Sequence, residues 1–310
     1  MPFDAITSPP EHWLTAAVSD LEGLSRDLAP ALRWRLDAAL SRLGAMNGAT
    51  SLREAMQRPA STPFVALVDA GATDLGLQGD PRAALLGRAT VLSYVYVRVQ
   101  DDLVDEPELV DRGAVYLMEA LLAEHLALFS AAVSDRAAFA WRSKIMRRFA
   151  EVAAAEVDDR GGGDAEVALD WMGEKFIPMA VPLAGMAVMA GRAETIEAMV
   201  AFVGEVGTAL QLVNDVFNVA EDHAGGRTTP VLRWLREAGV EMSGGAGRAK
   251  LLGHPVFQRS LDEARRYVDA AEARARGLGF EALAGVARHA RGMVDRAPER
   301  LCRLMLGMTV

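Results

Sequence analysis

The feature that most constrains the fold is a helical spacing of apolar residues that is interrupted only by short breaks. Hydrophobic residues three and four positions apart begin near Trp13 and continue through ALRWRLDAALSRLGAM. Ala, Leu, Val, Glu and Arg dominate, and no alternation of β-branched residues separates the turns. Gly, Pro, Asp or Ser mark the breaks, which fall at Met46–Ser51, Gly76–Pro81, Pro107–Arg112, Asp158–Asp164, Gly225–Pro230 and Met242–Pro255. The sequence predicts an all-α protein in which residues 1–310 form a single large helical bundle, with a central cavity between facing helices.

The composition and charge exclude several classes of function. The net charge is −9 and no stripe of Lys and Arg stands out, which argues against a nucleic-acid partner. A single cysteine, Cys302, rules out an intrachain disulfide and fits a reducing compartment. The first residues, MPFDAITSPPEHW, lack the basic and apolar regions of a secretory signal. The most apolar stretch, Phe176–Ala190, is about 15 residues long, short of the roughly 20 that span a membrane. We therefore expect a buried core helix there, and a soluble, cytoplasmic protein with no integral membrane segment.

The first candidate site is the acidic helix end VRVQDDLVDEPE, which carries Asp101, Asp102, Asp105 and Glu106. Asp101 and Asp105 lie one turn apart on the same helix face. Carboxylates near a helix C-terminus repel one another and oppose the helix dipole, so a cation would stabilise them. Their oxygens suit Mg²⁺. Taken alone, the motif also fits a solvated acidic helix end.

The second candidate site is a polar stripe in the otherwise apolar segment LQLVNDVFNVAEDHAGGRTTP. Five oxygen-bearing side chains lie within an arc of about 100° around the helix axis: Gln211, Asn214, Asp215, Asn218 and Asp222. Because apolar residues flank the stripe closely, leaving it buried without a partner would be costly. A metal ion and a polyanion would remove that cost. The spacing i, i+4 and i+8 of Asn, Asn and Asp makes this the more specific of the two motifs.

Together the motifs predict a two-sided Mg²⁺ clamp on a diphosphate. The metal ions would bridge phosphate oxygens and make the diphosphate a good leaving group. Arg98, one turn before the first carboxylates, either pairs with Asp101 or Asp102 in the metal-free protein or contacts the diphosphate. Three further basic residues beside the acidic clusters would complete the charge balance: Arg112, Lys175 and Arg227.

The helix faces below the motifs predict the floor of a pocket. Tyr94 lies two turns before the first motif on the same face, and Gly204 and Gly207 precede the second. These residues either pack in the core or line a hydrocarbon cavity whose depth Tyr94 limits. Phe217 is among the aromatic residues available near the site to steady a cation.

The motifs and their order resemble the class I isoprenoid synthase superfamily, and within it the trans-polyprenyl diphosphate synthases. The likeness runs from about Arg58 to Leu235. The stretch from RPASTP to QDDLVDE resembles the family's segment from its Arg-Pro motif to its first Asp-rich motif. GEKFIPMAVPLAGMAVMAGR resembles its Lys-bearing helix, and GTALQLVNDVFNVAED its second Asp-rich helix. The EDHAGGR tail is also similar to squalene and phytoene synthases. The resemblance implies the isoprenoid synthase fold, a prenyl diphosphate substrate, three Mg²⁺ ions with substrate bound, Lys175 as a diphosphate contact, and a homodimer.

The chain departs from this family in its basic segments. Chain-elongating members hold isopentenyl diphosphate with a Gly-Lys-Arg segment, where this chain has Glu54–Gln57 before its Arg-Pro. The family's Arg-Arg-Gly after the first motif is here Asp111–Gly113, and its later Gly-Lys loop is Gly226-Arg227. A second diphosphate would lack the basic residues that usually bind it. The Asn, Asn and Asp of the second motif match the spacing of the metal motif of terpene cyclases.

Three functional hypotheses follow. The leading one is a terpene synthase type of enzyme, which ionises one allylic diphosphate, releases the diphosphate and lets the cation cyclise or rearrange. The alternative is a prenyltransferase, either elongating a chain or joining two prenyl diphosphates head to head. Aromatic residues are only 6% of the chain, which counts against cyclisation because cyclases steady cations with aromatic faces. A non-catalytic subunit or prenyl-binding protein would not need the intact metal carboxylates. The residues expected to carry the chemistry are Asp101, Asp102, Asp105, Asn214, Asn218 and Asp222, with Asp215 as a further metal ligand.

Overall fold

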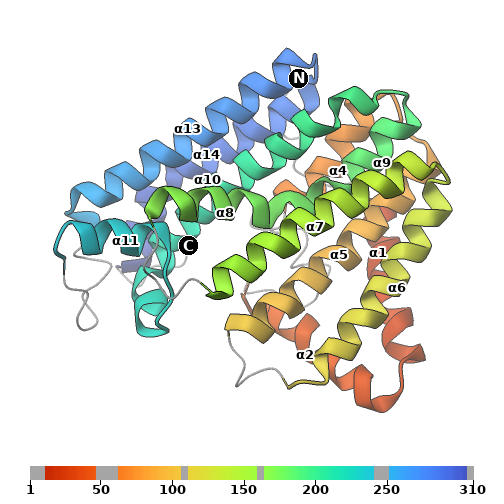
Figure 1. Cartoon of the computed structure of the whole chain (residues 1–310), viewed down its shortest axis with the longest axis horizontal. Helices are drawn as coiled ribbons and strands as arrows, with labels where there is room; N and C mark the ends of the chain where they lie inside the picture. Colours follow the sequence, from red (N-terminus) through yellow and green to blue (C-terminus); the bar gives the residue numbers. More distant parts are fainter. Residues whose placement is uncertain (1–10, 47–61, 106–110, 159–163, 241–250, 306–310) are drawn as a thin grey trace. The chain divides into compact units, whose positions relative to one another are not determined.

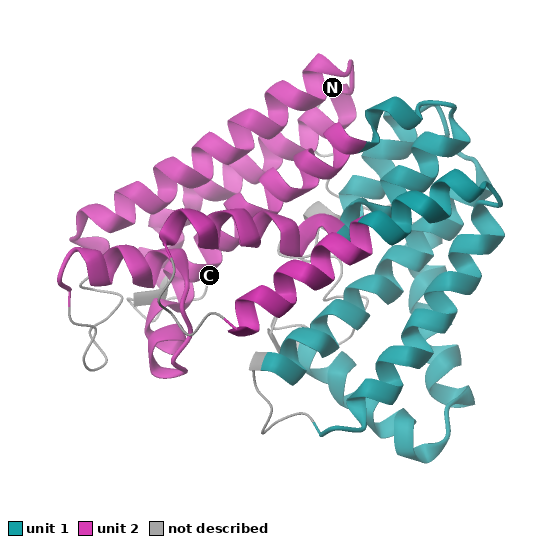
Figure 2. Ribbon diagram, in the orientation of Figure 1, with its two compact units in different colours: residues 1–144, 178–196 teal, residues 145–177, 197–310 magenta. Residues whose placement is uncertain are grey.

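The computed structural model describes residues 11–46, 62–105, 111–158, 164–240 and 251–305 (Figure 1). Within these ranges, helices are the only regular secondary structure. No strand occurs in these ranges, so the all-α prediction is confirmed there. The chain divides into two compact units, one of residues 1–144 and 178–196 and the other of residues 145–177 and 197–310 (Figure 2). Neither unit is a continuous stretch of sequence. The single domain over residues 1–310 stays a prediction.

In the first unit the long helix α5, Pro81–Asp105, is the centre of the packing. Leu86, Val95 and Val99 on this helix are almost completely buried, which gives the unit its apolar core. The helices that contact α5 are α1 (Glu11–Asp27), α2 (Pro30–Met46), α4 (Thr62–Asp74), α6 (Ala114–Ala132) and α9 (Val181–Met189). The short 3₁₀ helix η3, Ala193–Thr195, packs on α9. This packing places the first acidic motif at the C-terminal end of the unit's central helix.

In the second unit the longest helix is α10, Ile196–Ala224, and its inner face is fully buried at Ala209, Leu212 and Val216. Helices α13 (Pro255–Gly277) and α14 (Glu281–Met305) pack against each other, and α11 (Pro230–Glu237) contacts α13 and α8 (Ala165–Phe176) (Figure 1). Helix α7, Arg136–Asp158, contributes its residues from Ile145 onward to this unit. The second polar motif therefore lies on a core helix, as its apolar flanks predict.

Several helix starts follow capping signals that are readable in the sequence. The side chain of Asp164 accepts a hydrogen bond from a backbone N–H in the first turn of α8. Thr229 does the same for α11 and is followed by Pro230, while His254 caps α13 and is followed by Pro255. Proline suits the first helical position because the N–H that it lacks has no partner there. Helices α5, α11 and α13 begin at the prolines that end three of the predicted breaks.

The predicted single helix over Phe176–Ala190 is wrong. Helix α8 ends at Phe176, residues Ile177–Ala180 form a 3₁₀ turn, and α9 begins at Val181. Pro178 and Pro182 lack the N–H that a continuous helix would need, and proline rings clash with the preceding turn. The chain passes from the second unit to the first at this break. Burial of the segment is confirmed, since residues 177–187 are buried.

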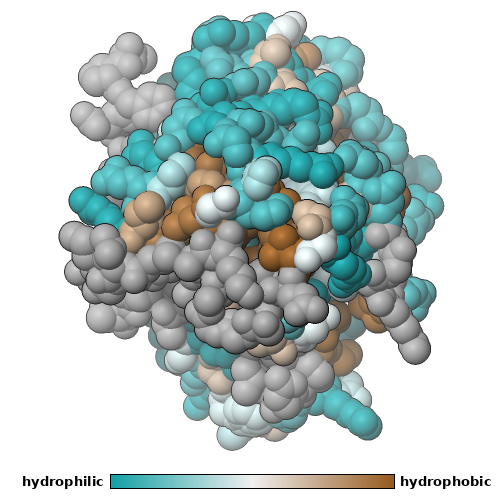
Figure 3. Space-filling model, turned by 90° about the vertical axis from the view of Figure 1, so that its left-hand side faces the viewer, coloured by the Kyte–Doolittle hydropathy of each residue, from teal (hydrophilic) through white to brown (hydrophobic). Residues whose placement is uncertain are grey.

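By length and composition, two helical stretches could cross a membrane: Ala114–Ala132 and Ala193–Ala224. Most of the second apolar window is buried, as expected for a core helix, whereas less than a third of the first is buried. On the face drawn in Figure 3, hydrophilic side chains cover most of the described surface, and hydrophobic ones appear only in small areas. The absence of an integral membrane segment stays a prediction.

The first testable prediction concerns Asp69 on α4. Burial raises the pKa of this carboxyl to about 6, although a hydrogen bond from Trp13 Nε1 at 3.0 Å opposes the shift. The folded protein thus binds the proton more tightly than the unfolded chain, and stability falls as the pH rises from about 4 to about 6. We expect Asp69→Asn, which keeps the acceptor for Trp13, to raise the free energy of unfolding at pH 8 by about 1–3 kcal/mol. Urea denaturation at pH 5 and pH 8 measures the difference, which should be larger at pH 8.

Asp80→Asn is the control, because hydrogen bonds from Arg82 lower the pKa of this partly exposed carboxyl. The Asp80→Asn substitution should not raise the free energy of unfolding at pH 8. An equal gain in stability from both variants would contradict the role assigned to burial of Asp69.

Candidate active site

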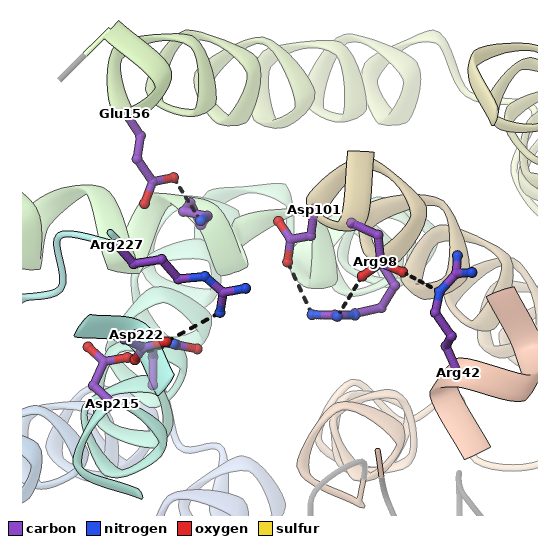
Figure 4. A network of polar contacts seen from close by, with 10 residues as sticks. Arg42, Arg98, Asp101, Glu156, Asp215, Asp222 and Arg227 are labelled. Atoms are coloured by element: carbon purple, nitrogen blue, oxygen red, sulfur yellow. Dashed lines mark hydrogen bonds and ion pairs between the residues drawn. The ribbon is translucent and has the colours of Figure 1, made fainter. Parts of the chain in front are cut away.

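The first cluster, named here the Asp101 cluster, consists of Arg42, Arg98, Asp101 and Asp102 in the first unit (Figure 4). Arg98 donates from Nη2 to Asp102 Oδ1 at 2.9 Å and from Nη1 to Asp101 Oδ2 at 3.4 Å. These are contacts across one helical turn, three and four residues apart. The predicted pairing of Arg98 with the carboxylates is confirmed, and its contact with a diphosphate stays a prediction.

Arg42 is a member of the Asp101 cluster that sequence reasoning missed. It lies on α2 and donates from Nε to Asp102 Oδ2 at 3.0 Å, so each carboxylate oxygen of Asp102 binds a different guanidinium group. The Asp102 side chain is only 12% exposed, which makes these charge-assisted bonds more valuable than those of a surface pair. No local spacing links residues 60 positions apart; only the packing of α2 on α5 brings them together.

Among the described residues, Arg112 is not joined to the first motif by a hydrogen bond or ion pair. Arg112 is exposed in the turn before α6 and makes no ion pair among the described residues. Its neighbour Asp111 instead accepts hydrogen bonds from Arg35. Tyr94 is half-buried on α5. Asp105 is the last residue of α5, and its side chain lies outside the described residues, as do Glu106, Glu54–Gln57 and Arg58-Pro59.

The second cluster, named here the Asn214 stripe, consists of Gln211, Asn214, Asp215, Asn218 and Asp222 on α10. Exposure is graded across it: Asp215 and Asp222 are 1% and 4% exposed, whereas Asn214 is exposed. Two internal hydrogen bonds run along the helix, from Gln211 Nε2 to Asp215 Oδ1 at 2.8 Å and from Asn218 Nδ2 to Asn214 Oδ1 at 3.0 Å. The stripe is therefore a buried edge of carboxyls beside an accessible edge of amides.

Asp215 is the most unusual group of the stripe. Burial raises the pKa of this carboxyl to about 8; the hydrogen bond from Gln211 and the charge of Lys175 lower it, and the charges of Asp222 and Glu156 raise it further. Its Oδ2 atom is buried and has no hydrogen-bond partner among the described residues. An unpartnered buried carboxyl oxygen is costly, and a cation beside it would favour the charged form.

Asp222 is held by the turn that follows α10. Gly226 has φ +70°, which lets the chain reverse: its N–H bonds to His223 O at 3.2 Å and the Arg227 N–H bonds to Asp222 O at 2.9 Å. This Schellman pattern brings the Arg227 side chain back over the helix end. There Nη1 donates to Asp222 Oδ1 at 3.2 Å (Figure 4). The Gly-Gly-Arg sequence after the stripe is the local signal for this arrangement.

Lys175 lies in the last turn of α8, where its Nζ pairs with Glu156 Oε2 of α7 at 2.7 Å. Its charge also lowers the pKa of Asp215, and its contact with a diphosphate stays a prediction. Glycines let α8 approach α10 closely. A Cβ atom on Gly204 would lie 3.3 Å from Gly173 O, and one on Gly207 would lie 2.2 Å from Phe176 Cγ.

These contacts decide between the two interpretations of the glycines. Gly204 and Gly207 pack against α8 and do not line an open cavity at these positions. Phe217 is half-buried, and the guanidinium of Arg300 on α14 lies 5.5 Å from the centre of its ring. Arg300 is a cation beside Phe217 that the sequence motifs do not reveal.

The donor set of the two clusters fits Mg²⁺. No three carboxylate, imidazole or thiolate side chains gather into a metal cage in the described part of the chain. Mg²⁺ seldom needs such a cage, since it usually takes one or two carboxylates, waters and substrate phosphate oxygens. The clusters offer only oxygen ligands, and Asp215 Oδ2 has no hydrogen-bond partner in the described structure. The described side chains that would supply oxygen ligands to Mg²⁺ are Asp101 and Asp102 in the first unit, and Asn214, Asp215, Asn218 and Asp222 in the second.

Comparison with solved structures finds several polyprenyl diphosphate synthases of similar fold. A geranylgeranyl pyrophosphate synthetase from the archaeon Geoglobus acetivorans gives a TM-score of 0.70 at 17% identity, over 93% of this chain and 98% of that one. A geranylgeranyl pyrophosphate synthase from Lactobacillus brevis, complexed with citrate, gives 0.68 at 14% identity, over 91% and 96%. A polyprenyl synthase from Caulobacter crescentus, complexed with calcium and isoprenyl diphosphate, gives 0.62 at 22% identity, over 93% and 98%.

These comparisons establish the fold. The chain has the all-α isoprenoid synthase fold, as the motifs predict, and the similar structures are polyprenyl diphosphate synthases. No family model matches the sequence, and no curated protein sequence matches it either. At 14–22% identity the similarity carries the fold and not the reaction.

The second testable prediction concerns the bond between Arg42 and Asp102. Arg42→Met leaves the mostly buried Asp102 carboxylate with one guanidinium partner, so we expect the free energy of unfolding to fall by about 1–3 kcal/mol. Arg82→Met is the matched control, because it breaks a pair with Asp80 in which the arginine is exposed. That change should cost much less stability, because solvent screens an exposed pair. If urea denaturation shows that both variants lower the free energy of unfolding equally, the ion pair of Arg42 and Asp102 stabilises the protein no more than an exposed pair does.

The third prediction concerns the contact between α8 and α10. The added methyl group of Gly207→Ala would overlap Phe176, so the Phe176 side chain or its helix must shift, at a cost of about 1–3 kcal/mol. Gly23→Ala on α1 is the control: the nearest atom to its new methyl group is the end of the Arg26 side chain at 3.8 Å. We expect that variant to be neutral or slightly more stable. Thermal unfolding of both variants provides the comparison, and a neutral Gly207→Ala would contradict the packing described.

Proposed function

We propose that the protein is a Mg²⁺-dependent class I isoprenoid synthase that acts on an allylic prenyl diphosphate, and that its reaction is prenyl transfer. The observation that carries the proposal is the Asn214 stripe. It is a row of oxygen ligands on a core helix, with a buried carboxyl oxygen that has no hydrogen-bond partner in the described structure. A magnesium–diphosphate complex is a ligand that would offset the cost of this burial.

Each polar residue has a role in this proposal. Asp101, Asp102 and Asp105 from the first motif, and Asn214, Asp215, Asn218 and Asp222 from the second, supply metal ligands. Bound Mg²⁺ would neutralise the diphosphate as it leaves the allylic carbon. The candidates for direct contact with the substrate are Arg98, Arg112, Lys175, Gln211 and Arg227, with Tyr94 and Phe217 beside the prenyl chain.

The comparisons change the ranking of the reactions. The segment Glu54–Gln57 lacks the basic residues that would hold a second diphosphate, which favours ionisation and cyclisation of a single diphosphate. The similar solved structures are polyprenyl diphosphate synthases, and one of them was solved with an isoprenyl diphosphate. They support the alternative, a prenyltransferase that elongates a chain.

Cyclisation remains the second candidate on one observation. Asn214, Asn218 and Asp222 have the spacing of a cyclase metal motif, and the two amides are joined by a hydrogen bond on the accessible edge of the stripe. That edge presents neutral amide oxygens where an elongating enzyme usually presents carboxylates.

The fourth prediction separates these reactions. The purified protein is incubated with C10, C15 and C20 allylic diphosphates and Mg²⁺, each with and without isopentenyl diphosphate. We expect longer prenyl diphosphates only when isopentenyl diphosphate is present, and no product after the metal is removed with EDTA. Hydrocarbons or alcohols formed without isopentenyl diphosphate would favour cyclisation. If the diphosphate is never released, the class I assignment is wrong.

A variant pair tests the metal role in the same assay. Asp101→Asn should lower the rate on the order of 100-fold, because it weakens a metal ligand. Asp111→Asn changes an exposed carboxylate of the same unit that pairs with Arg35 outside the cluster, and it should keep the wild-type rate. Equal rates for Asp101→Asn and the wild type would remove Asp101 from the site.

A further inference from the structure

Cations beside the two motifs are paired with carboxylates, but in two different ways. Arg98 pairs with carboxylates of the first motif, and Arg227 pairs with Asp222. Both therefore contact groups that the proposed function assigns to Mg²⁺. Lys175 differs, because its ion pair is with Glu156 on α7, which belongs to neither motif (Figure 4).

This difference has a consequence for binding. Metal ions that bind the motif carboxylates would neutralise their negative charge, so that Arg98 and Arg227 become available to an anion. The same ions leave the pair of Lys175 and Glu156 intact. An anion that binds at Lys175 must therefore compete directly with the Glu156 carboxylate.

We propose that Glu156 is an internal counter-anion that occupies Lys175 in the place of a phosphate group, so that a diphosphate binds by displacing the Glu156 carboxylate. The inference rests on the proposed function, since it takes Lys175 to be a diphosphate contact. Glu156 is thus a positioning residue that sets the affinity of the site for the diphosphate.

The geometry suits a displaceable pair. The Nζ and Oε2 atoms are 2.7 Å apart, and the side chains are 28% and 47% exposed, so a polyanion can reach the ammonium group from solvent. Glu156 lies in the last turn of α7 and Lys175 in the last turn of α8, where the two carboxyl-terminal helix ends meet. The charges of both residues also act on the buried carboxyl of Asp215 in the Asn214 stripe, so the pair lies within electrostatic range of that group.

The pair is not what joins the two helices. Arg148, two turns earlier on α7, donates from Nε to Glu174 Oε2 of α8 at 3.0 Å and makes a second bond to the other oxygen of Glu174. This bidentate contact remains when Glu156 is changed. A variant at Glu156 should therefore keep the fold while releasing Lys175.

The fifth prediction is a gain in affinity. Binding of inorganic pyrophosphate to the full chain is measured by calorimetry at a fixed Mg²⁺ concentration. Glu156→Gln should bind pyrophosphate roughly two- to fivefold more tightly than the wild type, the range expected when a partly exposed ion pair no longer has to be broken. The matched control is Glu151→Gln on the same helix, an exposed residue with no ion pair among the described residues, and it should leave the affinity unchanged.

A second background tests whether Lys175 carries the effect. In Lys175→Met, the further change Glu156→Gln should give no more gain than Glu151→Gln does. Wild-type affinity in Glu156→Gln would overturn the inference, as would the same gain from Glu151→Gln, since that would be a general effect of charge. If the wild type itself binds no pyrophosphate with Mg²⁺, the proposed function fails. Binding by the wild type without a gain in Glu156→Gln overturns only the role of Glu156.

Discussion

A carboxyl group cannot be buried in an apolar core helix without a partner or a proton, and this constraint governs the second unit. Asp215 satisfies it only in part, with one oxygen hydrogen-bonded to Gln211 and a pKa raised to about 8 by burial. Such a group lowers the stability of the free protein. In the proposed function, a cation that binds with the substrate would offset the cost of burying this carboxyl.

The ion pairs around the motifs are another consequence of the same constraint. Asp102 has a guanidinium group on each oxygen, and Asp222 is covered by Arg227. An acidic protein with net charge −9 thus places its cations where its partly buried carboxylates need them. In the proposed reaction the same cations would turn to the diphosphate when the metal ions arrive. Metal and diphosphate would then bind cooperatively, because each relieves a charge that the other leaves uncompensated.

Much of this fold could be read from the sequence. The apolar spacing predicts the helices, and the Pro and Gly residues predict the starts at Pro81, Pro230 and Pro255. The one clear error, a continuous helix over Phe176–Ala190, came from weighing hydrophobicity above the missing N–H groups of Pro178 and Pro182. The polar face of α10 was also predictable, since a helical period places its five members together whatever the rest of the chain does.

The contacts of the residues around the two motifs were less predictable. Local spacing correctly pairs Arg98 with the carboxylates three and four residues on. The Gly-Gly-Arg turn returns Arg227 to Asp222 for an equally local reason, the positive φ of Gly226. By contrast, Arg42, Glu156 and Arg300 come from other helices, and Arg112, adjacent to the first motif in sequence, makes no ion pair within the described residues.

The sequence by itself determined the helices, the two polar motifs and the contacts that close within one or two turns, because helix geometry depends only on neighbouring residues. The tertiary structure alone decided which oxygen of Asp102 receives Arg42, that Gly204 and Gly207 are covered by α8, and that Glu156 holds Lys175. These depend on how helices pack against one another. Side chains 19 to 60 residues apart meet only when burial of the apolar faces has set the positions of their helices.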